Sequence, residues 1–157
     1  MEEQRKELTL ERTFDAPREL VFKAWTDPAL VAEWWGPHGF TSTAKTWDVT
    51  PGGQIDLVML AGKELGPMAD HEFPMNGEFE EIVNGEKLVY TSNAIMDGKE
   101  VLTTRNIVTF DEQDGKTKLT VHIVVTMTTP EAAGPLAGME IGWNQTLDRL
   151  VEFVAKQ

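Results

Sequence analysis

"MEIGWNQTLDRLVEFVA", residues 139–155, is the longest amphipathic helix that the sequence predicts, and it decides what the rest of the chain must provide. Its apolar and small side chains recur at helical spacing and share one face, while the opposite face is polar. The apolar face consists of Met139, Gly142, Trp143, Thr146, Leu147, Leu150, Val151 and Val154. Because such a face is stable only against another layer, the chain must supply a second apolar surface.

That second layer is predicted to be an antiparallel sheet. From Phe40 onward apolar and polar residues alternate, most clearly over residues 119–127, and this period of two is typical of strands. The later runs are separated by dipeptides that favour β-hairpin turns, namely Asn84-Gly85, Asp97-Gly98 and Asp114-Gly115. With one run near the N-terminus, the predicted strands are 8–14, 42–49, 54–60, 72–83, 87–95, 101–111 and 116–127.

Two short helices are predicted between the first strand and the second. Residues 18–25 and 28–35 each carry apolar side chains at positions i, i+1, i+4 and i+5. Asp27 is suited to cap the second helix and Pro28 to occupy its first position. Gly36-Pro37 ends that helix, because proline cannot continue the hydrogen-bond ladder.

The element order is therefore strand, two short helices, six strands and one long helix. A chain of 157 residues suits a single domain, here residues 1–157 with a core of about 8–155. Consecutive hairpins imply an antiparallel meander. We predict an α+β fold in which a curved sheet of about seven strands wraps the C-terminal helix, with the short helices closing one end.

Composition excludes several classes of partner. Fourteen basic residues against 26 acidic ones give a net charge of −12, so the chain has no general electrostatic footprint for nucleic acid or for anionic membranes. No apolar run approaches the ~20 residues of a membrane helix. There is no cysteine, which excludes disulfides and thiol nucleophiles. The charged N-terminus is not a secretory signal, and a cytoplasmic protein is expected.

Aromatic and methionine side chains are the candidates for a binding site. The chain has five tryptophans and seven methionines, which supply rigid rings and adaptable apolar surface. Trp34 is predicted to be core and Trp35 to lie at the mouth of a cavity. The orientation of Arg105 is left open by its position within its strand. The candidate ligand-binding residues are Trp35, Trp47, Met59, Phe79, Arg105, Met127, Met139 and Trp143.

Motifs for catalysis are not found, so the catalytic residues stay unassigned. The three histidines form no HxxxH or HExxH pair, and no metal or cofactor is predicted. Neither serine lies in a GxSxG motif, and no glycine-rich phosphate loop is present. An enzyme would need ionisable groups that converge in a pocket. The groups to check are Arg105, His71, Glu78 and Glu80.

The element order and four segments together resemble a known family. The segments are "TFDAPRELVFKAWTDPALVAEWWGP", "PGG", "GEFEEIVNGEKLVYT" and "GWNQTLDRLVEF". The chain is similar, over about residues 8–153, to the family named for the activator of the heat-shock-protein ATPase, within the START/SRPBCC helix-grip superfamily. The resemblance implies a deep apolar cavity between the sheet and the last helix.

Three functions follow from that resemblance as expectations, since a fold alone does not define a function. The first is the binding of a small apolar or aromatic molecule in the cavity. The second is an enzyme of the cyclase, dehydratase or hydrolase type. The third is regulation of a chaperone ATPase, although the founding co-chaperones pair this domain with a separate N-terminal one. Exposed edge strands make a homodimer plausible.

Overall fold

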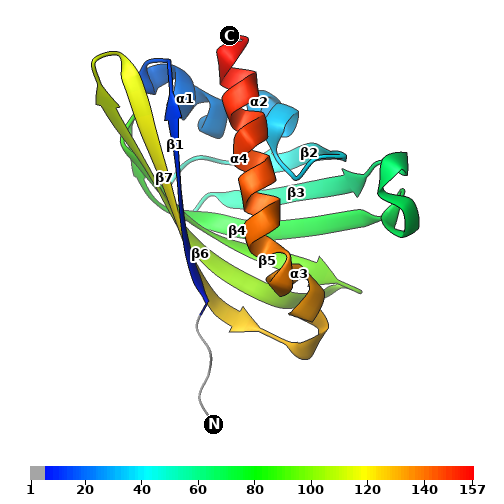
Figure 1. Ribbon diagram of the computed structural model, residues 1–157. Coiled ribbons are helices and arrows are strands. Elements are labelled where there is room, and N and C mark those ends of the chain that lie inside the picture. The colour runs from blue at the N-terminus through cyan, green and yellow to red at the C-terminus, as the bar shows by residue number, and fades with distance from the viewer. Residues whose placement is uncertain (1–5) are drawn as a thin grey trace.

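The computed structural model describes residues 6–157 and shows a curved antiparallel sheet crossed on one face by a long helix (Figure 1). The strands are β1 (Glu7–Phe14), β2 (Phe40–Trp47), β3 (Gln54–Ala61), β4 (Glu72–Val83), β5 (Lys87–Met96), β6 (Lys99–Gln113) and β7 (Lys116–Thr128). The helices are α1 (Arg18–Thr26), α2 (Pro28–Trp34), α3 (Ala133–Ala137) and α4 (Met139–Ala155). Two short 3₁₀ turns are η1 (Lys63–Met68) and η2 (Pro130–Ala132).

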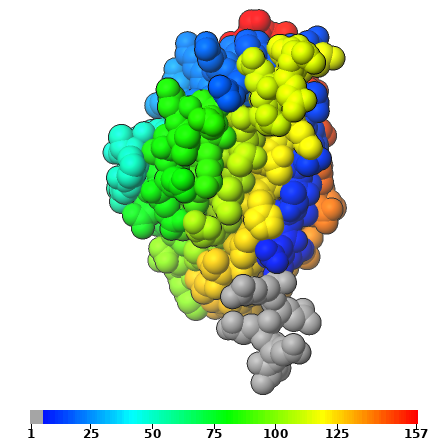
Figure 2. Space-filling model, turned by 90° about the vertical axis from the view of Figure 1, so that its left-hand side faces the viewer, coloured from blue at the N-terminus to red at the C-terminus, as the bar shows by residue number. Residues whose placement is uncertain are grey.

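The strand order β1-β7-β6-β5-β4-β3-β2 confirms the predicted meander and the α+β class. Strands β2 to β7 pair with their neighbours in sequence, and β1 closes the order by pairing with β7. The face covered by α4 is called the inner face below, and the opposite one the outer face. Figure 2 looks onto the outer face, where the colours follow the sheet order from green through yellow to blue.

The hairpin turns form as their sequences predict. Asp97 and Gly98 both have positive φ, at 53° and 75°, and Asp114 and Gly115 repeat this at 54° and 77°. Two successive positive values define the tight turn that matches the twist of paired strands, and Asp-Gly tolerates them. In the third hairpin, Asn84-Gly85 between β4 and β5, only Gly85 has a positive φ, at 76°.

Several boundaries differ from the prediction, and β6 extends two residues beyond the predicted 101–111 at each end. Strand β2 begins at Phe40 and ends at Trp47, two residues before the predicted span, because Phe40 pairs with Ala61 in β3. After Trp47 the chain turns toward β3, and the Gly53 amide donates to the Thr50 carbonyl at 2.7 Å. The segment predicted as an irregular loop contains η1. Long-range strand pairing sets such ends, so local pattern does not reveal them.

The short helices begin where predicted and cover one end of the sheet (Figure 1). Asp27 caps α2 by accepting a hydrogen bond from the Ala29 amide at 3.0 Å, and Pro28 occupies the first turn. The carbonyls of Ala24 and Trp25 at the end of α1 have no partner within that helix. They accept hydrogen bonds at 2.9 Å from the indoles of Trp34 and Trp47 respectively.

Helix α4 buries the predicted stripe against the inner face. Leu147 and Leu150 are fully buried and Val154 nearly so, whereas Trp143 is half-buried. The ring of Pro37 packs beside Gly142 on this face. Within residues 6–157 no helix combines the length and the apolar composition needed to cross a membrane.

Candidate functional site

An aromatic cluster fills the end of the sheet beneath α1 and α2, with Trp35 at its centre. The Trp35 ring lies 5.4 to 6.5 Å, between ring centroids, from five other rings. These rings are Trp25, Trp34, Trp47, Tyr90 and Trp143. Most pairs are edge-to-face or tilted, which is the arrangement that aromatic quadrupoles favour. The cluster joins α1, α2, α4 and two strands into one packed unit.

Of the two adjacent tryptophans, Trp34 has its predicted role and Trp35 does not. Trp34 has no exposed surface, which confirms its assignment to the core. Trp35 was predicted at a cavity mouth, yet it is only 5% exposed and lies at the centre of the cluster. Its burial arises because Trp143 from α4, more than 100 residues away in sequence, covers it. Trp35 is therefore a core residue rather than a mouth residue.

A buried polar cluster lies on the inner face next to these rings. It consists of Tyr90 and Ser92 from β5 and Thr104 and Asn106 from β6. Tyr90 and Asn106 are completely buried, Thr104 is nearly so, and Ser92 is half-buried. The Ser92 and Thr104 hydroxyls share a hydrogen bond of 2.7 Å, and Asn106 donates to the Tyr90 carbonyl at 3.3 Å. Four neutral polar side chains thus stand in an apolar surrounding.

The hydroxyl of Tyr90 makes no hydrogen bond with any described residue. Its ring is enclosed by aromatic neighbours that include Phe79 at 5.8 Å and Trp47 at 6.3 Å. Burial raises the pKa of Tyr90 far above its ordinary value, because the charged form would lose its hydration. The side chain is therefore a neutral phenol with an unused donor.

Beside the polar cluster, part of the inner face carries side chains that are only half-buried. Figure 1 shows β3, β4 and β5 running out beyond the helix on one side. Half-buried side chains mark this region, and we call them the inner-face patch: Met59, Met75, Ser92, Ala94 and Trp143. Met75 lies opposite Ala94 in the β4–β5 register, and Met59 lies against Gly36. The patch offers adaptable apolar surface next to buried hydrogen-bonding groups.

The structure separates the predicted ligand-binding residues into three groups. Met59 and Trp143 belong to the inner-face patch. The buried candidates are Trp35, Trp47, Phe79 and Met139, and Met127 is half-buried in β7. Arg105 faces outward, since its side chain is 45% exposed on the outer face. There Arg105 Nε donates to Glu80 Oε1 at 2.9 Å.

The four groups named for catalysis do not converge. Arg105 and Glu80 form the outer-face ion pair, Glu78 is exposed on the same face opposite Thr91, and His71 is exposed just before β4. Within the described residues no three histidine, aspartate or glutamate side chains are arranged to hold a metal ion. All four side chains are therefore exposed, and the three on the outer face are spread over β4 and β6.

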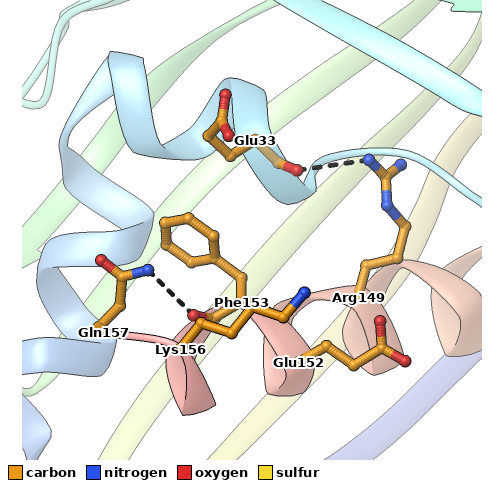
Figure 3. A pocket seen from close by; sticks show the side chains of 6 residues that line it. All are labelled: Glu33, Arg149, Glu152, Phe153, Lys156 and Gln157. Carbon is orange, nitrogen blue, oxygen red and sulfur yellow. Dashed lines mark hydrogen bonds between the residues drawn. The ribbon is translucent and has the colours of Figure 1, made fainter.

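Two pockets of similar size lie at the surface, and neither is the apolar cavity that the resemblance implied. One, of about 310 Å³, lies on the polar outer face and is lined by Gln54, Asn76, Gly77, Glu78, Thr91, Asn93 and Glu100. The other, of about 330 Å³, lies between α2 and the end of α4 (Figure 3). Its lining consists of Glu33, Arg149, Glu152, Phe153, Lys156 and Gln157.

Arg149 dominates the pocket between α2 and α4, and its role is structural. Its guanidinium extends from α4 toward the end of α2 (Figure 3). Nη1 donates to the carbonyls of Gly36 at 2.8 Å and Phe40 at 3.1 Å, and also contacts those of Trp35 and Pro37. Desolvation lowers the pKa of Arg149, although Glu152 and Glu33 partly compensate. The cation holds the turn after α2 in place.

The polar cluster is the part of the site that sequence reasoning missed. The missed residues are Tyr90, Ser92, Thr104 and Asn106. The alternation of residues along each strand shows which face they occupy. Each of them shares its face with apolar neighbours such as Leu88 and Val108. That signal identifies polar residues on the inner face. It does not show that two strands bring them into contact.

Replacing Tyr90 with phenylalanine is expected to raise the free energy of unfolding by about 1 kcal/mol, because the buried hydroxyl lacks a protein partner. Urea denaturation followed by circular dichroism measures the change. Thr117→Val is the control, since the buried Thr117 hydroxyl donates to the Ala16 carbonyl at 2.8 Å. That variant should lose about 1 kcal/mol. A comparable loss in Tyr90→Phe would contradict the assignment of an unused hydroxyl.

Comparison with known proteins agrees with the architecture. The model of the family described as "Activator of Hsp90 ATPase homolog 1-like protein" matches residues 15–155. No curated protein matches the sequence. Among solved structures, a protein from Chromobacterium violaceum is similar at 26% identity with a TM-score of 0.80, over 94% of this chain and 96% of that one.

Two further solved structures share the fold at lower identity. A protein from Arthrobacter aurescens has a TM-score of 0.84 at 19% identity, over 96% of this chain and 87% of its own. The AHSA1 protein from Silicibacter pomeroyi has a TM-score of 0.74 at 21% identity, over 96% and 98%. The family match spans nearly the whole described domain. The chain therefore belongs to the Activator of Hsp90 ATPase homolog 1-like family, within the START/SRPBCC superfamily.

Proposed function

We propose that this protein binds a small apolar or aromatic molecule at the inner-face patch. The observation that carries the proposal is the combination of half-buried apolar side chains with a buried polar cluster that includes an unused hydroxyl. Small-molecule sites are mostly apolar and contain a few placed polar groups that orient the ligand. The fold supports the same reading, since START/SRPBCC-like folds generally bind hydrophobic ligands.

The small, flexible and aromatic side chains of the inner-face patch favour ligand binding there. Ser92 and Ala94 place small side chains on the inner face of β5, where they lie opposite Gly77 and Met75 of β4. The flanking methionines, Met59 and Met75, can change rotamer at low cost and so adapt to a ligand. Trp143 from α4 supplies a half-buried ring that can stack on an aromatic molecule. Binding would remove this apolar surface from water, which is the main source of affinity.

The same region favours binding over chemistry. Acid–base catalysis needs ionisable groups within reach of the substrate. Among residues 6–157, the buried side chains include no aspartate, glutamate, histidine, lysine or arginine. Tyr90 is the titratable group of the polar cluster, and burial raises its pKa. A neutral phenol can orient a ligand but is a poor base.

Naphthalene is a suitable first probe, and we expect it to bind at the inner-face patch. Calorimetric titration gives the affinity, and nuclear magnetic resonance of the five indole N–H groups locates the site. The Trp143 signal should move first. Ala94→Phe places a ring on the patch and should weaken binding at least about tenfold, a loss of about 1.4 kcal/mol. Thr109→Phe, on the exposed side of β6, is the matched control and should bind as the wild type does.

Two results would count against this proposal. One is the absence of any heat of binding or indole shift with naphthalene at its solubility limit. The other is equal affinity in Ala94→Phe and in the wild type, which would place the probe elsewhere on the molecule. Both variants should first be shown to unfold cooperatively.

A further inference from the structure

The polar cluster borders the inner-face patch. Its internal hydrogen bonds leave some donors and acceptors unused. The Asn106 amide nitrogen lies within reach of three acceptors: Thr104 Oγ1 at 3.1 Å, and Ser92 Oγ and the Tyr90 carbonyl at 3.3 Å each. An amide nitrogen has two hydrogens, so it cannot serve all three acceptors fully. Thr104 can donate to Asn106 Oδ1 at 3.3 Å. Most of these distances are longer than the usual 2.9–3.0 Å, which marks weak bonds.

Ser92 is the member of the cluster that a ligand can reach. Its side chain is half-buried, whereas Tyr90, Thr104 and Asn106 are buried. A hydroxyl oxygen has two lone pairs and one hydrogen, so Ser92 retains capacity beside its bond to Thr104. The Tyr90 hydroxyl is enclosed among rings, so Ser92 is the accessible group. A hydroxyl or carbonyl group of a ligand would find partners here.

The buried side chains of residues 6–157 include no charged group. Arg105 is paired with Glu80 on the outer face. Arg149 directs its guanidinium at the carbonyls that follow α2, and the other charged side chains of residues 6–157 are not buried. A carboxylate placed against Ser92 would therefore lose hydration without gaining a buried counterion. That loss is severe for an ion and small for a hydroxyl group.

We infer that the inner-face patch selects an uncharged molecule with an apolar body and one hydroxyl or carbonyl group, and that it discriminates against the corresponding carboxylate. The inference rests on the proposed binding function and adds the chemical class of the ligand. The neutral hydroxyl of Ser92, held by Thr104 and Asn106 behind it, recognises the polar group. The methionines and Trp143 hold the apolar body.

Three probes with one skeleton test this: naphthalene, 2-naphthol and 2-naphthoate, each titrated calorimetrically at pH 7. A net hydrogen bond between neutral groups predicts that 2-naphthol binds about fivefold more tightly than naphthalene. Burial of an unpaired carboxylate predicts that 2-naphthoate binds at least about 100-fold more weakly than 2-naphthol.

Matched variants assign the preference to the polar cluster. Thr104→Val keeps the shape of the side chain and removes its hydroxyl. In this variant the advantage of 2-naphthol over naphthalene should fall to less than about twofold, while naphthalene affinity is retained. Thr109→Val makes the same substitution on the outer side of the same strand and should keep the full advantage. Ser92→Ala provides a second test if Thr104→Val does not fold.

The outcomes separate this inference from the proposed function. If none of the three probes binds, the proposed function fails. If naphthalene and 2-naphthol bind equally, binding stands and the selection for a polar group is overturned. Tighter binding of 2-naphthoate than of 2-naphthol would overturn the exclusion of charge. If Thr104→Val and Ser92→Ala both kept the preference for 2-naphthol over naphthalene, residues other than these would recognise the polar group.

Discussion

Replacing Trp35 with alanine is expected to lower the free energy of unfolding by about 4 kcal/mol, the usual range for removing a buried tryptophan. The ring contacts Trp25, Trp34 and Trp47 at one end of the sheet and Trp143 on α4. Its loss would leave a void that these rings cannot fill together, because each is fixed by its own contacts. Trp34 and Trp47 also donate their indole N–H groups to carbonyls of α1.

Urea denaturation followed by far-ultraviolet circular dichroism measures this loss, since fluorescence itself changes when a tryptophan is removed. Trp143→Ala is the control, because that ring is half-buried and packs on one aromatic neighbour. It should cost about 2 kcal/mol or less. Equal losses in the two variants would contradict the central place assigned to Trp35.

Replacing Arg149 with methionine is the second large effect, and we expect a loss of about 3 kcal/mol. Methionine preserves much of the apolar stem but removes the donors that serve the carbonyls of Gly36, Phe40 and neighbouring residues. These carbonyls lie where α2 turns into β2, and the cation also compensates the negative end of that helix. Without it, half-buried acceptors lose a charged partner.

The same denaturation experiment tests Arg149. Arg105→Met is the matched control, since Arg105 forms an exposed ion pair with Glu80 and should contribute about 0.5 kcal/mol. Arg149→Lys should fall between the wild type and Arg149→Met, because an ammonium lacks the planar fork that reaches several carbonyls. If Arg149→Met were as stable as Arg105→Met, the carbonyl contacts would carry no net stabilisation.

Local signals explain why so much of the architecture was predictable. The Asp97-Gly98 and Asp114-Gly115 turns adopt the positive φ values that their residues favour, and they define the hairpins β5–β6 and β6–β7. Asp27 and Pro28 begin α2 as predicted. Such features depend on residues within a few positions of one another, so a single sequence contains the information that specifies them.

The candidate site was only partly predictable, because it combines distant segments. Met59 and Trp143 were identified from residue type, whereas the position of Arg105 within its strand left its orientation open, and the structure places it on the outer face. Pairing of Thr91 with Arg105 in the β5–β6 register directs the arginine outward, and the same register brings Ser92 beside Thr104. A shift of one residue would exchange the two faces.

The sequence by itself determined the element order, the hairpins and the apolar stripe of α4, because these follow from periodicity and from the backbone preferences of individual residues. The tertiary structure alone decided which residues lie together. It placed Trp35 under Trp143, assembled the neutral polar cluster from two strands, and directed Arg149 at the turn after α2. Those contacts depend on strand register and on the position of α4 across the sheet. Both are set by the packing of the whole core rather than by any local run of residues.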